Sequence, residues 1–138
     1  MTKLSMAEIL EQTSKIGNRN KQIEFLRQHY SKHLHEALAF GYDERIQWLL
    51  PETDPPFTPI TGEELKMNLH RECHLQKLYY FVAGGKGAAV RPAQRENMFI
   101  QLLESVDIKD AELLLSLKKK ILPYGIDRQL IEDAYGKL

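Results

Sequence analysis

The apolar positions of this sequence recur with a helical period along most of the chain. Apolar residues lie three or four positions apart in segments that begin near Ser5, Asn20, Ser31, Thr61, Pro92, Asp107 and Asp127. This spacing places the apolar side chains of each segment on one face of a helix. No stretch has the pattern of a strand pair. The sequence therefore predicts an all-α fold of packed helical hairpins.

The start of the chain carries a helix-capping signal. Residues 5–8 have the Ser-x-x-Glu form of a capping box, in which the hydroxyl and the carboxylate satisfy each other's backbone donors. A helix should follow and stop near Gly17. Its inner face would carry Met6, Ile9, Leu10 and Thr13. Residues 20–30 form a second amphipathic segment, with a stripe made of Ile23, Leu26 and Tyr30.

The next segment predicts two more short helices. Ser31 can cap a helix that ends near Gly41, although this boundary is also compatible with a kink inside one longer helix. Asp43 is then expected to cap a short helix. That helix would carry Ile46, Leu49 and Leu50, with Trp48 close by.

Residues 51–59 interrupt the helical pattern with four prolines. Proline lacks a backbone donor and disfavours helix at the residue before it, so an extended, semi-rigid connector is predicted. We expect this connector to pack Phe57 onto its own domain. Binding of the proline-rich segment to an aromatic groove of a partner is the alternative.

Residues 61–106 contain the strongest helical signals. A second capping box at residues 61–64 opens a helix that is expected to end at residues 81–83. Gly84 and Gly85 would end it in left-handed conformations, and Pro92 suits the first turn of the following helix. Further helices are expected from Asp107 and from Asp127. We interpret the three lysines at 118–120 as charges that complement a helix dipole.

Composition limits the class of protein. The chain has 138 residues, and its 19 basic and 19 acidic residues cancel. We expect a single domain over residues 1–138, since neither flank of the connector is large enough to fold alone. The charge balance argues against a protein that mainly coats nucleic acid. The single cysteine, Cys73, and the lack of a long apolar run predict a soluble cytoplasmic protein without a membrane partner.

One local cluster has the spacing of metal ligands. On a helix, His70 and His74 would lie one turn apart with Cys73 beside them, which suits a divalent metal. The sequence offers no evident further ligands, because the other histidines lie in a separate helix. We therefore predict neither a metal site nor a cofactor, and we interpret the cluster as a polar helix face.

Catalytic signatures are also lacking. Cys73 and His74 are adjacent on a predicted helix and point about 100° apart, so they cannot pair as nucleophile and base. The glycine-rich residues 84–87 lack the lysine followed by Ser or Thr that a P-loop requires. We expect a protein that is not an enzyme.

The loop between the two strongest helices has a basic neighbourhood. Lys77, Lys86, Arg91 and Arg95 flank it, and Tyr79 and Tyr80 are close in sequence. This mixture could contact a nucleic-acid backbone or an acidic protein surface. A solvated hairpin tip whose tyrosines pack inward is the alternative.

Several segments resemble a small family of uncharacterised proteins of tailed bacteriophages. They are Trp48-Leu49-Leu50-Pro51 running into Pro55-Pro56-Phe57, the segments 77–85 and 95–106, and residues 110–114 followed by Lys118, Lys120 and Leu122. The tail at residues 133–138 matches only loosely. The resemblance implies a phage origin and carries over no activity. We therefore expect a phage-encoded interaction protein that binds a host or phage protein during infection, with nucleic-acid binding in replication or transcription as the alternative.

Overall fold

The computed structural model describes residues 4–51, 53–58, 76–84, 89–106, 108–121 and 123–137. Its elements are α1 (Met6–Ser14), α2 (Arg19–Gln28), α3 (Lys32–Tyr42), η2 (Leu78–Tyr80), α5 (Pro92–Ser105), α6 (Ile108–Lys118), η4 (Pro123–Gly125) and α7 (Arg128–Tyr135). The predicted all-α class is confirmed. In the described ranges, the pairing of extended backbone is limited to one bridge between Trp48 and Val82.

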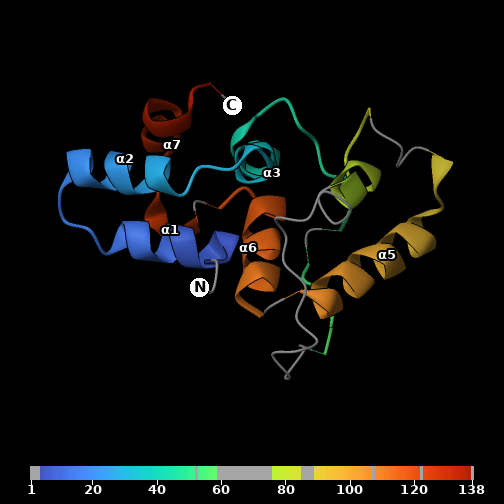
Figure 1. Cartoon of the computed structure of the whole chain (residues 1–138). Coiled ribbons are helices and arrows are strands. Elements are labelled where there is room, and N and C mark those ends of the chain that lie inside the picture. The colour runs from blue at the N-terminus through green and yellow to red at the C-terminus, as the bar shows by residue number, and fades with distance from the viewer. Residues whose placement is uncertain are drawn as a thin grey trace.

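Helix α6 lies at the centre of the molecule. Figure 1 shows α1 and α2 on one side of α6 and α5 on the other, and α6 contacts α1, α3 and α5. Its buried apolar residues are Ala111, Leu113, Leu114 and Leu117. They belong to one cluster of buried side chains that extends from Met6 in α1 to Ile131 in α7. None of the helices in the described ranges has the length and apolar character needed to cross a membrane.

A glycine lets α3 approach α6 closely. Gly41 lies within α3, one residue before its end, and a Cβ atom at this position would lie 3.1 Å from the Cα of Leu117 and would overlap its side chain. A larger residue would therefore push the two helices apart. The helix was expected to end near Gly41, and the helix bounds agree within one residue.

Three caps predicted from sequence, at Ser5, Ser31 and Asp127, begin helices in the structure. Glu8 N donates to Ser5 Oγ and Ser5 N donates to Glu8 Oε1, both at 3.2 Å, which completes the capping box of α1. Ser31 and Asp127 cap α3 and α7 with their side chains, which accept hydrogen bonds from Leu34 N and Leu130 N. A break, not a kink, separates α2 from α3. Pro92 is the first residue of α5, as predicted.

Two helix predictions are wrong. Residues 43–50 do not form a helix capped by Asp43, because the Asp43 side chain turns the chain after α3 and Trp48 enters the bridge with Val82. The helix expected to end at residues 81–83 ends with η2 at Tyr80 instead. Phe81 and Val82 are used for backbone pairing with the segment before the connector. Both errors have the same cause, the backbone pairing of residues 47–49 with residues 81–83, which are distant in sequence.

The structure tests some of the remaining predictions, and others lie outside the described residues. Phe57 packs against the core, as predicted for the connector, and Gly84 has a φ of 83°. Tyr30 lies beyond the end of α2 and is 53% exposed, so its predicted place on the buried stripe is wrong. The capping box at 61–64, the helix up to residue 75, and Gly85 lie outside the described residues.

Candidate functional site

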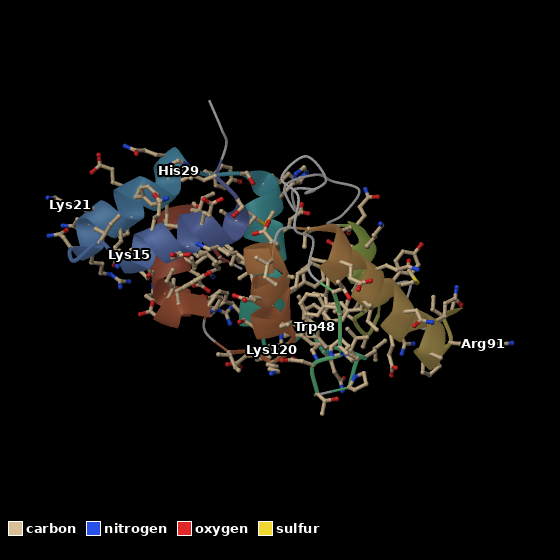
Figure 2. The ribbon with its side chains drawn as sticks, turned by 90° about the horizontal axis from the view of Figure 1, so that it is seen from below. Lys15, Lys21, His29, Trp48, Arg91 and Lys120 are labelled. Carbon is tan, nitrogen blue, oxygen red and sulfur yellow. The ribbon has the colours of Figure 1, made fainter. Side chains whose placement is uncertain are left out.

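A groove of about 760 Å³ lies beside the end of α6. We call it the basic groove. It is lined by Glu44, Arg45, Ile46, Gln47, Trp48, Leu50, Pro51, Lys118, Lys119 and Lys120. Figure 2 shows Trp48 and Lys120 near each other at this end of α6, in the middle of the molecule, with Lys15 and Lys21 toward one end of the molecule and Arg91 toward the other. The groove thus combines four cations and one carboxylate with apolar side chains.

Hydrogen bonds between Asp43 and Arg45 determine the backbone conformation at the rim of the basic groove. The Asp43 carboxylate accepts hydrogen bonds from Arg45 N at 2.9 Å and from Arg45 Nε and Nη2 at 3.1 and 3.0 Å. These bonds lower the pKa of Asp43 to about 2, with the side-chain bond from Arg45 as the largest cause. The bonds favour an extended chain after α3 over another turn of helix.

Trp48 holds the wall of the groove onto α3 and α5. Its indole Nε1 donates to Phe40 O at 2.8 Å, and its ring packs edge-on against Phe40 and Phe99 at centroid distances of 6.1 and 6.4 Å. The neighbouring backbone is fixed by Leu49 N, which donates to Phe81 O at 2.7 Å, and by Ala83 N, which donates to Gln47 O at 2.8 Å. Trp48 is half-buried, so part of its indole faces the groove.

The three lysines that end α6 reach the connector and the end of α3. Lys118 is buried, and its ammonium donates to Pro51 O at 2.7 Å and to Thr53 O at 3.0 Å. Lys119 pairs with Asp54 at 2.9 Å. Sequence reasoning assigned these lysines to the helix dipole and missed their carbonyl partners, since partners so far along the chain leave no local signal.

Lys120 has an unusual backbone conformation. Its φ is 59°, a left-handed value that glycine adopts most easily. Lys120 N donates to Leu117 O at 3.1 Å and Ile121 N to Ser116 O at 3.0 Å, the bond pattern of a Schellman motif with lysine at the usual glycine position. The side chain then donates to Phe40 O at 3.0 Å and to Asp43 O at 2.8 Å. Burial lowers the pKa of Lys120.

The cations at the surface of the groove keep hydrogen-bonding capacity. A lysine ammonium has three donors and an arginine guanidinium has five. Toward the described residues, Lys119 uses one donor and Lys120 uses two, while Arg45 Nη1 makes no hydrogen bond. The Arg45 side chain is 83% exposed. These three residues can therefore donate to an anionic ligand without releasing their internal partners.

A smaller hollow of about 250 Å³ adjoins the basic groove. We call it the apolar pocket. It is lined by Leu50, Pro51, Thr53, Asp54, Pro55, Pro56, Glu96, Phe99, Ile100 and Lys118. Leu50, Pro51 and Lys118 line both hollows. The connector thus places an apolar site next to a cationic one.

Comparison with known protein families places the chain. A family model described as a family of unknown function (DUF6433) matches residues 9–123. The chain belongs to this family. Every residue that lines the basic groove or the apolar pocket lies within the DUF6433 match, whereas α7 lies beyond it. No curated protein and no solved structure matches the chain.

The contact residues predicted for this DUF6433 protein have different surroundings. Lys77 and Arg91 are exposed, and Figure 2 shows Arg91 at the outer end of α5. Arg95 is only 9% exposed, and its guanidinium donates to Val90 O at 3.0 Å and, more weakly, to Leu49 O at 3.5 Å. Arg95 thus joins α5 to the wall of the basic groove. Lys86 lies outside the described residues.

The other candidates from the sequence can be placed only in part. Tyr79 is 42% exposed and packs edge-on against Phe40 at 5.2 Å, and Tyr80 is half-buried. The cluster of His70, Cys73 and His74 lies outside the described residues. Within the residues that are described, no group of three or more His, Cys, Asp or Glu side chains could hold a metal ion.

Proposed function

We propose that this DUF6433 chain is a non-enzymatic interaction protein that binds a host or phage protein in the cytoplasm of an infected cell. The observation that carries this proposal is the basic groove, where Arg45, Lys119 and Lys120 surround exposed parts of Trp48 and Leu50. Hydrogen-bond donors mixed with aromatic and aliphatic surface are typical of protein-binding sites. The resemblance to tailed-phage proteins supports the setting of infection.

The geometry favours a protein partner over nucleic acid. Binding to a phosphate backbone needs several cations that are free to face successive phosphates. Of the residues first considered for that role, Arg95 is buried and its guanidinium is bonded to backbone carbonyls. The basic groove also contains the carboxylate of Glu44, and Asp54 lies nearby, so a ligand with a phosphate on every unit suits it less well than a segment with a few carboxylates among apolar residues. A partner that offers both charge and apolar surface suits the groove better.

The test compares three forms of the full chain as baits in extract from infected cells. They are the wild type, a groove variant with Arg45→Glu and Lys119→Glu, and a control with Lys21→Glu and Lys32→Glu. Lys21 and Lys32 are exposed and lie outside both hollows. The control replaces two basic residues with glutamate, as the groove variant does, so the change in net charge is the same in both. Each extract is divided into one half that is treated with nuclease and one half that is not, and retained proteins are identified by mass spectrometry.

We expect the wild type and the control to retain a protein that the groove variant loses. Circular dichroism should show the same helix content for all three baits, because every substituted residue is exposed, and the near-ultraviolet signal of Trp48 checks that the groove wall is kept when the side-chain bonds from Arg45 to Asp43 are lost. Retention of the same proteins by all three would contradict the proposal. Retention that disappears with nuclease treatment would favour the nucleic-acid alternative instead.

A further inference from the structure

We infer that the basic groove and the apolar pocket together bind a short acidic segment of the partner protein, with one large apolar side chain of that segment in the apolar pocket. This inference rests on the proposed function and names the chemistry of the partner. It is supported by the local charge, by the shape and lining of the pocket, and by the way in which the two hollows share a border.

The first argument is the local charge of a neutral molecule. The chain has no net charge, so any attraction for an acidic ligand must come from a local group of cations. Arg45, Lys119 and Lys120 form such a group, and each keeps donors that the described residues do not use. Carboxylates accept hydrogen bonds from these donors with a charge-assisted gain. Acidic side chains are therefore the complementary ligand.

The second argument is the apolar pocket. Its volume of about 250 Å³ exceeds the roughly 150 Å³ of a protein cavity that accommodates benzene, so an aromatic or large aliphatic side chain can enter. The half-buried Ile100 and the two prolines Pro55 and Pro56 supply apolar walls. Burial of one large side chain in such a pocket is the usual energetic anchor of a peptide complex.

The third argument is the border between the hollows. Pro51 and Leu50 line both hollows. The buried Lys118 ammonium holds the backbone there by donating hydrogen bonds to Pro51 O and Thr53 O. An extended segment that crosses Pro51 would place acidic residues against the cations and an apolar residue in the pocket. Because the connector is held in place before binding, little ordering entropy is lost when the segment binds.

The experiment selects ligands from a random library of short displayed peptides on the full wild-type chain. Peptides that also bind the groove variant, Arg45→Glu with Lys119→Glu, are removed. We expect the retained peptides to combine several Asp or Glu residues with one large apolar residue. A retained peptide without tryptophan is then synthesised, and its binding is followed by the fluorescence of Trp48, which is the only tryptophan of the chain and lines the groove.

Matched variants separate the two hollows. The groove variant, Arg45→Glu with Lys119→Glu, should bind the peptide at least about ten-fold more weakly than the wild type, because attractive charge pairs become repulsive. Ile100→Gln should also lower the affinity for the peptide about ten-fold, since an apolar wall of the pocket is replaced by an amide. The controls are Lys21→Glu with Lys32→Glu, and Ile121→Gln at a residue that is 57% exposed and outside both hollows. Both controls should bind like the wild type.

Three results would overturn the inference. They are a library that yields no groove-dependent peptides or yields peptides without an acidic excess, equal binding of the peptide to the wild type and the Ile100→Gln variant, and displacement of the peptide by a single-stranded DNA oligonucleotide at equal concentration. If the pull-down still shows a protein that depends on the groove, the proposed function stands and only the acidic chemistry of the partner is wrong. If the pull-down fails as well, both proposals fall.

Discussion

Lys120 shows how a single residue joins three parts of the molecule. It ends α6 in a left-handed conformation, and its ammonium binds two carbonyls at the end of α3 beside the groove. For a residue with a Cβ atom, this conformation costs about 1–2 kcal/mol relative to an ordinary helical one. The hydrogen bonds of the ammonium, each contributing about 0.5–1.5 kcal/mol, offset that cost.

Substitutions at Lys120 separate the two effects. Lys120→Ala should destabilise the chain by about 1–2 kcal/mol, because the bonds are lost while the backbone strain remains. Lys120→Gly loses the same bonds but relieves the strain, so it should be about 1 kcal/mol more stable than the alanine variant. Urea unfolding of both variants measures the difference. A glycine variant no more stable than the alanine variant would show that the backbone of Lys120 carries no strain.

Asp43 gives the stability of the chain a defined dependence on acid. The pKa of its carboxyl is lowered from 3.8 to about 2 in the folded state, so this group stabilises the fold above pH 3.8. That stabilisation is lost as the pH falls through the folded pKa. Asp43→Asn should therefore be less stable than the wild type at neutral pH, with a difference that shrinks toward pH 2. Urea unfolding at several pH values tests this, and a difference that does not change with pH would contradict it.

Residue roles that depend on distant backbone could not be predicted. Arg95 looked like a surface cation in sequence, yet its guanidinium donates to Val90 O and approaches Leu49 O. Lys118 likewise donates to carbonyls of the connector. A backbone carbonyl exists at every residue, so the sequence gives no sign of which one a long side chain will reach.

At the scale of elements, local signals were sufficient to predict the caps of α1, α3 and α7. Ser5, Ser31 and Asp127 each bind a backbone donor three residues ahead, and that geometry depends only on neighbouring residues. The segment at residues 43–50 could not be predicted in this way. Its extended form depends on Asp43 and Arg45 and on pairing with Phe81 and Ala83, which are distant in sequence.

The contact between α3 and α6 is sensitive to one methyl group. Gly41→Ala gains about 1 kcal/mol of helix propensity, but the new Cβ atom would overlap Leu117. Overpacking of this kind usually costs about 1–3 kcal/mol, so we expect net destabilisation. Gly17→Ala is the control, since a Cβ atom there meets no atom within 4 Å, and it should be neutral or slightly stabilising. Thermal unfolding of both variants tests this prediction. Equal melting temperatures for Gly41→Ala and Gly17→Ala would show that α3 can move away from α6 without a loss of stability.

At the scale of the whole molecule, the basic groove is made where separate parts of the chain meet. Residues 44–51 form one side, the end of α6 forms the other, and the connector separates the groove from the apolar pocket. The sequence predicted the all-α class, which the structure confirms, and a basic contact surface at Lys77, Lys86, Arg91 and Arg95, which stays a prediction. The assembly of Arg45, Trp48 and the lysines of α6 required the fold.

Site-specific photocross-linking in infected cells tests the central claim most directly. A photoreactive residue is placed at Gln47, which is exposed and lines the basic groove, or at Lys21, which lies outside the groove and which Figure 2 shows at one end of the molecule. We predict a discrete protein adduct from position 47 that is absent from position 21 and is lost when Arg45 and Lys119 are reversed. No adduct from position 47, the same adduct from both positions, or an adduct with nucleic acid would contradict the assignment of the groove as a protein-binding site.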